Sequence, residues 1–279
     1  MTTKQLSKKV FNKRNTLIFV GGFIVFFILL VAIFAPWIAT HDPNIMSLEN
    51  RYQPPSAEHI FGLDQDGSDV FSKVVYGSRI SFYVAISVVS ICLIIGLIIG
   101  SLAGYIGGRV DQYFMRFVDM LYAFPGFLLA ISLVAVLGPS VHNLILAMCA
   151  TGWATYARLV RAEVLHLKSK EYVQSAKALG ANPIRVVILH IWPNLVGPIV
   201  VQSSFAMAGT IISESSLSFL GLGAPPTTPT WGALLNAGRK ILIEAPHVSV
   251  FPGLAIVLLV LGFNLFGDGL RDYLDPKKN

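Results

Sequence analysis

The chain has 279 residues, of which 54% are hydrophobic and only 13% are charged, and its formal net charge is +6. A soluble globular chain carries about 25% charged residues, so this composition indicates a protein built for a lipid bilayer. The basic residues are spread over short segments between apolar runs. That distribution argues against a nucleic-acid-binding protein, the other class that a basic chain suggests.

Charge-free apolar runs predict the membrane spans. A span needs about 20 apolar residues to cross roughly 30 Å of hydrocarbon, and it must be helical because lipid offers no partners to free backbone groups. The run Met120–Ala157 is too long for one span, and Gly138-Pro139 near its middle predicts a tight turn between two. We therefore expect an all-α membrane protein with six transmembrane helices. Their ranges are 16–38, 80–105, 115–137, 142–160, 194–214 and 248–267.

Two apolar segments need separate interpretation. The run at 16–38 is longer than the apolar core of a signal peptide, and Phe34-Ala35-Pro36-Trp37 is a poor cleavage site, so we expect an uncleaved first span. The run Ser215–Gly238 contains three prolines and four glycines, which favour turns over a continuous helix. We expect it to form a loop or a partly re-entrant segment.

The basic residues also predict orientation, because cytoplasmic loops carry an excess of Lys and Arg. With the N-terminus inside the cell, inside segments hold 16 of the 21 basic residues, so both termini are expected in the cytoplasm. The inside residues are Lys4, Lys8, Lys9, Lys13, Arg14, Arg109, Arg116, Arg158, Arg161, Lys168, Lys170, Lys177, Arg185, Arg271, Lys277 and Lys278. The outside residues are Arg51, Lys73, Arg79, Arg239 and Lys240.

Recognisable catalytic and cofactor motifs are missing. The sequence has no G-x-x-x-x-G-K-[ST] phosphate loop, no H-E-x-x-H pair and no G-x-S-x-G elbow, so we expect no enzyme activity, no cofactor and no metal site in this chain. Cys92 and Cys149 lie in separate apolar runs, which favours two small buried side chains over a disulfide. The acidic segment 64–69 resembles half of a calcium loop, but its twelfth residue is Val75, so helix-capping aspartates in a turn-rich loop are expected.

The expected spans contain few ionisable residues. Charged groups inside a bilayer are costly and usually mark ion or proton pathways. Asp119 and Glu214 lie near the ends of their spans, where both can reach an interface. The chain therefore has the features of a transport path without an energy source of its own.

The segment EYVQSAKALGANPIRVVILHIWPN, residues 171–194, predicts a polar helical hairpin between the fourth and fifth spans. Ser169 is expected to cap its first helix, Gly180 to end that helix in a left-handed conformation, and Asn182-Pro183 to start the second. Trp192-Pro193 is expected to break the chain before the fifth span. A helix of about two turns is unstable alone in water and needs a docking surface. From the residues alone, that surface is either the protein's own bundle or a cleft on another protein.

This segment resembles the EAA signature of permease subunits in binding-protein-dependent ABC importers. The signature consists of Glu-Ala-Ala, three residues, Gly and a hydrophobic stretch ending in Pro, and it appears here as Gln174-Ser175-Ala176, Gly180 and Pro193. The resemblance implies that residues 169–183 form a coupling helix hairpin that binds a groove of an ATPase subunit. The implied contact residues are Glu171, Tyr172, Gln174, Ser175, Ala176, Lys177, Leu179, Gly180 and Pro193. Gln174 replaces the acidic residue of the signature and keeps hydrogen bonding without charge.

The segment FGLDQDGSDVFSKVVYGSRIS, residues 61–81, is similar to the loop after the first span in permeases of the dipeptide, oligopeptide and nickel group. Glu214–Gly223, the later Trp231-Gly232 and the tail Gly267–Pro276 also match that group, and its C-type subunit more than its B-type. The signature residues are Gly62, Asp64, Gly67, Asp69, Tyr76, Gly77, Arg79 and Glu214.

The resemblance implies a type I ABC importer permease fold with four parts. These are a cytoplasmic tail (1–15), a first span with an external loop (16–79), a five-helix permease core (80–268) that contains the coupling hairpin, and a second cytoplasmic tail (269–279).

The resemblance also implies partners and location. The chain is expected in the bacterial inner (plasma) membrane as a heterodimer with a second permease. Two ATPase subunits that bind ATP and Mg²⁺ and an external solute-binding protein complete the assembly. Peptides are the expected cargo, and nickel or a metal–chelator complex is the alternative. An ion-coupled carrier or channel and a membrane scaffold are the rival classes.

Overall fold

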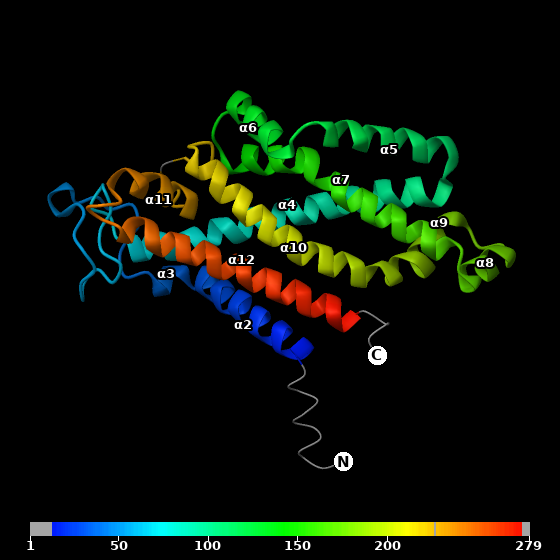
Figure 1. The fold of residues 1–279 in the computed structure, drawn as a ribbon, viewed down its shortest axis with the longest axis horizontal. Coiled ribbons are helices and arrows are strands. Elements are labelled where there is room, and N and C mark those ends of the chain that lie inside the picture. The colour runs from blue at the N-terminus through cyan, green and yellow to red at the C-terminus, as the bar shows by residue number, and fades with distance from the viewer. Residues whose placement is uncertain (1–12, 226, 275–279) are drawn as a thin grey trace, which may run out of the picture.

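The computed structural model describes residues 13–225 and 227–274, which form a bundle of long helices (Figure 1). In chain order the helices are α2 (Lys13–Ile33), α3 (Ala35–Ile38), η1 (Leu48–Asn50), α4 (Val70–Ile106), α5 (Gly108–Ala123), α6 (Gly126–Leu137), α7 (Val141–Lys168), α8 (Glu171–Ala178), α9 (Pro183–Val186), η2 (Val187–Ile191), α10 (Trp192–Phe219), α11 (Trp231–Gly238), η3 (Arg239–Ile241) and α12 (His247–Leu274). The expected all-α fold is confirmed. Residues 1–12 and 275–279 of the expected tails lie outside the described residues.

Four helical segments in the described ranges are long and apolar enough to cross a membrane. They are Thr16–Ile33 of α2, the whole of α4, the stretch Pro183–Phe219 and α12. Helices α5 and α6 reach that length only as a pair, and the pair is bent by 80°. Helix α7 has 28 residues but is more polar and is not among the four. The segments fit a multi-pass membrane protein, whereas the expected count of six spans is not confirmed.

Prolines explain two expected boundaries that are wrong. The first span was expected to run to residue 38, but α2 ends at Ile33, because Pro36 has no N–H to continue the ladder. Pro36 instead lies in the first turn of the short helix α3. The expected third span 115–137 is two helices. Pro125 disfavours the helical conformation at Phe124, and the chain turns there between α5 and α6. The turn at Gly138 between α6 and α7 is confirmed.

Other helices extend beyond their expected ends. Helix α4 starts well before residue 80, because Asp69 caps it and Lys73 in its first turn pairs with Asp64. Helices α7 and α12 likewise run on to Lys168 and Leu274. The expected loop 215–238 is wrong in part, since α10 continues to Phe219 and α11 occupies its end.

The expected break at Trp192-Pro193 is also wrong. The five-residue π-helix η2 joins α9 to α10, so the chain stays helical from Pro183 to Phe219. Pro193 lies at the N-terminal end of α10. The wider π turn leaves a backbone carbonyl without the usual partner, which accommodates a proline.

Helices α4 and α7 pack closely through three glycines of α4. Gly96, Gly100 and Gly104 repeat every four residues and face α7. A Cβ added to Gly100 would lie 2.6 Å from the carbonyl oxygen of Ala157 and 2.8 Å from the Cβ of Val160. The two backbones reach this separation only because these positions carry no side chain.

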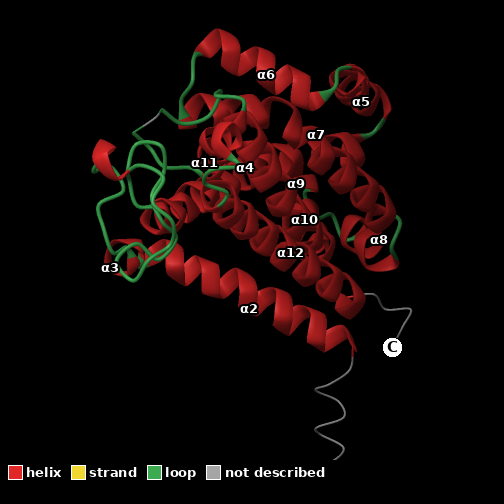
Figure 2. Cartoon of the chain, turned by 60° about the vertical axis from the view of Figure 1, so that its left-hand side comes forward, coloured by secondary structure: helices red, strands yellow, loops and turns green. Residues whose placement is uncertain are grey.

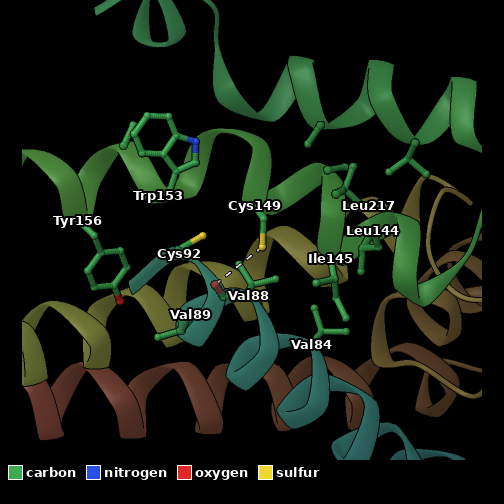
Figure 3. Packing of buried hydrophobic residues seen from close by; sticks show 14 of the residues in the cluster. Val84, Val88, Val89, Cys92, Leu144, Ile145, Cys149, Trp153, Tyr156 and Leu217 are labelled. Carbon is green, nitrogen blue, oxygen red and sulfur yellow. Dashed lines mark hydrogen bonds between the residues drawn. The ribbon is translucent and has the colours of Figure 1, made fainter. Parts of the chain in front are cut away.

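The core beside this contact contains both cysteines (Figure 3). Cys92 of α4 and Cys149 of α7 are buried free thiols, and the Cys149 thiol donates to the carbonyl oxygen of Val88 at 3.9 Å. Trp153 and Tyr156 of α7 belong to the same cluster. The expectation of two small buried side chains without a disulfide is confirmed.

The bundle separates two polar regions. The irregular segment 39–69, with α11 beside it, lies at one end of the molecule, and α8 lies at the opposite end (Figure 1). Helices α4 and α7 cover the distance between these ends. Helix α2 packs along α12 on another side of the bundle (Figure 2). Helix α2 begins, and α12 ends, on the side that faces away from segment 39–69.

Gly100→Ala is expected to destabilise the bundle, because the added methyl group overlaps the backbone and side chains of α7. Overpacking of this kind costs about 1–3 kcal/mol. Gly209→Ala in α10 is the matched control, since nothing lies within 4 Å of its added Cβ. Thermal unfolding of both purified variants in detergent measures the difference. A Tm for Gly100→Ala equal to that of Gly209→Ala would contradict the close α4–α7 contact.

Candidate functional site

The hairpin of α8 and α9 is anchored on the bundle through a buried valine. Val173 of α8 is fully buried, in a cluster with Val164 of α7, Val186 of α9 and Leu195 of α10. The interpretation that the hairpin packs on its own bundle is therefore correct for this face. Because four helices share the cluster, α8 cannot shift without moving α7 and α10 or exposing apolar side chains to water.

A Schellman motif ends α8. The N–H of Gly180 donates to the carbonyl of Lys177 at 2.9 Å, and the N–H of Ala181 donates to the carbonyl of Ala176 at 3.1 Å. Gly180 has a φ of +81°, which glycine adopts without steric cost. Asn182 then caps α9 by accepting the N–H of Ile184 at 2.9 Å. The predicted roles of Gly180 and Asn182 are confirmed.

The predicted cap at Ser169 is wrong. Ser169 belongs to the end of α7, where its hydroxyl donates to the carbonyl of His166 at 2.8 Å. Lys170 occupies the N-cap position of α8 and makes no side-chain cap bond. Gln174 instead ties α8 to α7, because its amide Nε2 donates to the carbonyl of Lys168 at 2.7 Å. An ionised glutamate has no donor for this bond, so glutamine in place of the acidic signature residue has a structural consequence.

The outer surface of the hairpin is apolar at its tip. Leu179 is 89% exposed and Ile184 is 68% exposed. Beside the tip, the Lys177 ammonium lies 4.9 Å from the centre of the Tyr105 ring. Desolvation, with a smaller contribution from the charge of Lys168, lowers the pKa of Lys177.

The remaining residues predicted for this contact lie on the same hairpin, with one exception. Glu171, Tyr172 and Ser175 are exposed on α8, and Ala176 is half-buried. Pro193 is exposed at the start of α10, beyond the hairpin. The predicted residues thus lie on α8 and in the turn after it, with different degrees of exposure, and Pro193 lies at the start of α10.

The second predicted group builds the junction between segment 39–69 and α4. Asp69 caps α4 by accepting the N–H of Ser72 at 2.8 Å. Asp64 accepts the N–H groups of Asp66 at 2.9 Å and Ser68 at 3.0 Å. Its other oxygen pairs with Lys73. The expectation of turn-forming and helix-capping aspartates is confirmed.

Glycine is required at Gly67 because the chain folds back on itself there. Its φ is +70°, and an added Cβ would lie 1.9 Å from the carbonyl oxygen of Ser47. Gly62 similarly faces the imidazole of His247, whose Nε2 lies 3.1 Å from the carbonyl oxygen of Leu63. These contacts hold segment 39–69 against the start of α12.

Tyr76, Gly77 and Arg79 were expected in the loop, and that placement is wrong, since all three lie in α4. Gly77 provides room for Trp231 of α11, because an added Cβ would lie 2.7 Å from the indole ring. The indole N–H donates to the carbonyl of Val74 at 2.8 Å. Tyr76 is half-buried and Arg79 is exposed on the same helix. This part of the signature therefore serves helix packing.

Glu214 of α10 is buried and links α10 to α4. Its carboxylate accepts hydrogen bonds from Ser218 at 2.8 Å, Ser215 at 3.3 Å and Ser81 of α4 at 3.4 Å. A buried carboxylate is tolerated only with such partners. Glu214 thus belongs to the bundle interior and is separate from the loop junction.

The sequence analysis assigned no substrate-binding residues, and the structure contains a cavity of about 310 Å³ between α4, α6, α7 and α10. Its polar lining includes Thr151, Thr155, Tyr156, Gln202 and Ser213. All five lie within apolar runs of the sequence. Polar side chains inside charge-free apolar runs are the sequence signal that could have located this cavity.

Two known protein families match parts of this chain. Residues 96–279 match the family described as binding-protein-dependent transport system inner membrane component. Residues 13–55 match the N-terminal TM domain of oligopeptide transport permease C.

Two curated relatives are similar over nearly the whole chain. The dipeptide transport system permease protein DppC of Alkalihalophilus pseudofirmus is 43% identical over 265 residues, which cover 95% of this chain and 87% of the relative. The glutathione transport system permease protein GsiD of Escherichia coli O6:K15:H31 is 47% identical over 266 residues, which cover 95% of this chain and 88% of the relative.

Gln174→Glu is expected to loosen α8 from α7, because a carboxylate cannot donate to the Lys168 carbonyl. A hydrogen bond of this kind contributes about 0.5–1.5 kcal/mol. Hydrogen–deuterium exchange should therefore be faster for the backbone amides of residues 171–181. Ser175→Glu is the control, since it adds the same charge at the exposed neighbouring position without removing the bond. Equal exchange in both variants would show that Gln174 does not fasten the hairpin.

Proposed function

The chain belongs to the family of binding-protein-dependent transport system inner membrane components, and from this premise we propose that it forms half of the translocation path of an ATP-driven peptide importer. It is a permease subunit and not an enzyme. The proposal for this chain concerns its cargo, its partners, its orientation and the residues that couple it to ATP hydrolysis.

One observation carries the proposal: the α8 hairpin is fastened to the bundle on one face and exposes apolar side chains on the other. Val173 is buried among α7, α9 and α10, whereas Leu179 and Ile184 point into solvent. Leu179 precedes the membrane-crossing segment Pro183–Phe219, and Ile184 is the second residue of that segment. Exposed apolar side chains at this end of a span suit a surface that another protein covers. We assign this surface to an ATPase subunit, with Glu171, Tyr172, Ser175 and Lys177 around it.

We assign the partners from the resemblance to binding-protein-dependent importers, which the family match supports. The absence of a phosphate loop in the sequence agrees with ATP binding by a separate subunit. ATP and Mg²⁺ belong to two separate ATPase subunits, and an external solute-binding protein delivers the cargo. A second permease completes the path. The cavity between α4, α6, α7 and α10 is the surface of this chain that we assign to the path.

The lining of that cavity favours peptides over a bare metal ion. Hydroxyl and amide groups from Thr151, Thr155, Gln202 and Ser213 line it, together with apolar side chains. Such groups match the amides of a peptide backbone, whereas nickel prefers imidazole, thiolate or carboxylate ligands. The names of the dipeptide and glutathione relatives agree with this cargo.

We place both termini and the hairpin in the cytoplasm. The excess of basic residues in these segments supports that orientation. The direction of the helices is consistent with it, because α2 begins and α12 ends away from segment 39–69 (Figure 1). Segment 39–69 and α11 then face the solute-binding protein.

Uptake into proteoliposomes that contain the full set of subunits tests the function. Labelled dipeptide should accumulate only with ATP, the ATPase subunits and the binding protein present. Gly180→Val should reduce this uptake several-fold, because a β-branched residue in the left-handed region costs about 1–2 kcal/mol and displaces the hairpin.

Gly180→Asn is the matched control, since asparagine tolerates the left-handed conformation, and it should retain most of the uptake. Wild-type uptake by Gly180→Val would argue against the coupling role. Uptake of Ni²⁺ in place of peptide would show that the same machinery imports a metal cargo. Uptake without the ATPase subunits would identify an ion-coupled carrier.

Cysteine labelling tests the orientation. Ser56→Cys and Thr228→Cys should react with a membrane-impermeant maleimide in intact spheroplasts, whereas Ser175→Cys should react only after permeabilisation. The native Cys92 and Cys149 are buried and should give little background. Labelling of Ser175→Cys from outside would reverse the topology.

A further inference from the structure

Two histidines and a glutamate come together where segment 39–69 meets α4. The ligand atoms of His41, Glu58 and His59 all lie within 4.8 Å of one another. The two histidine rings are 4.6 Å apart, centre to centre. Ligand atoms bound to one tetrahedral zinc ion lie about 3.3 Å apart, as follows from bond lengths near 2.0 Å. Small side-chain rotations would therefore bring all three groups onto a single ion.

Asp69 orients the His59 ring, because its Oδ1 lies 3.0 Å from Nδ1 of His59. The Nδ1 of His41 lies 3.0 Å from the Thr40 hydroxyl and 3.9 Å from the same Asp69 oxygen, so Thr40 is its closer partner. The Asp69 side chain is only 1% exposed, and its other oxygen caps α4. An Nδ1–H that donates to a carboxylate leaves Nε2 as the metal-binding atom, which is the usual arrangement around zinc.

The backbone of both histidines is also fixed. The N–H of His41 donates to the hydroxyl of Ser72 in the first turn of α4, at 3.1 Å. His59 lies in a turn in which its N–H donates to the Ser56 hydroxyl at 3.0 Å and its carbonyl accepts the N–H of Gly62 at 2.9 Å. The two histidines are thus held in place before any ion binds, which lowers the entropy cost of binding.

The cluster is accessible to solvent. The His41 side chain is 37% exposed and that of His59 is 19% exposed. His41 also lines an open cavity of about 520 Å³ together with Thr40 and Tyr76. An ion can therefore reach the ring nitrogens without unfolding the junction.

We propose that His41, Glu58 and His59 bind one Zn²⁺ ion, through the Nε2 atoms of the histidines and the carboxylate of Glu58. Imidazole ligands select zinc over magnesium or calcium, which prefer oxygen. The negative charges of Glu58 and Asp69 balance the two positive charges of the ion. The fourth ligand position is left for water. Asp69 acts as a positioning residue, and the ion fastens two parts of segment 39–69 to the start of α4.

Zinc binding by the full-length chain in detergent tests this proposal. A protein without a polyhistidine tag is stripped with chelator and titrated with Zn²⁺ at pH 7.5, and bound metal is counted by mass spectrometry. One equivalent should bind and raise the Tm, because a ligand specific to the folded state stabilises it. Co²⁺ in place of zinc should show the absorption bands of a tetrahedral site with nitrogen and oxygen ligands.

His59→Ala and Glu58→Gln should each lower the zinc affinity at least ~10-fold. His142→Ala, an exposed histidine at the start of α7, is the control and should bind like wild type. Asp69→Asn keeps a good helix cap and should leave the Tm of the metal-free protein nearly unchanged while weakening zinc binding about 10–100-fold.

Two results would overturn the site. One is the absence of a bound equivalent in the wild-type chain, and the other is binding that His59→Ala and Glu58→Gln leave unaltered. Neither result bears on peptide uptake, because the readout is metal binding by this chain alone.

Discussion

The contact between α4 and α7 holds the two polar ends of the bundle in a fixed relation. Three glycines of α4 let the backbones approach until an added Cβ would lie 2.6 Å from the carbonyl oxygen of Ala157. The cap of α4 lies in the junction with segment 39–69, and α7 leads directly into the hairpin. Arg161 of α7 also connects α5 to these two helices, because its guanidinium donates hydrogen bonds to Asp111 of α5 at 2.5 and 2.6 Å. The rest of the molecule is arranged around this pair.

The hairpin and α10 complete the coupling between the ends. Val173 shares its cluster with α7 and α10, and Glu214 joins α10 to Ser81 of α4. A force on the hairpin therefore reaches α4, α7 and α10, which are three of the four helices around the cavity. A packed core responds to such a force by changing between discrete arrangements and not by bending continuously. A permease moved by a separate ATPase requires such switching between discrete arrangements.

Local chemistry was predictable from the sequence, whereas features set by tertiary contacts were not. The sequence predicted the left-handed Gly180 and the cap at Asn182, because each depends on a few neighbouring residues. The predicted start of α4 was wrong, because the sequence does not show that Lys73 pairs with Asp64 in the first turn of the helix. The sequence predicted no metal site, because His41 and His59 are well separated in sequence and the contact between their rings is set by the fold. The role of Gln174 likewise required the position of the Lys168 carbonyl.

The two ends of the α4–α7 pair have different capacities to regulate transport. A ligand shifts an equilibrium between two bundle states only if it binds them with different affinity. The proposed zinc ligands and Asp69 all lie in segment 39–69 and the cap of α4, where Ser72 bonds both His41 and Asp69 and Asp69 bonds His59. Zinc would therefore stabilise both states equally. The hairpin differs, because its buried cluster joins α7, α8, α9 and α10. Under the proposed function, a partner bound there acts on several helices of the bundle and favours one arrangement of them.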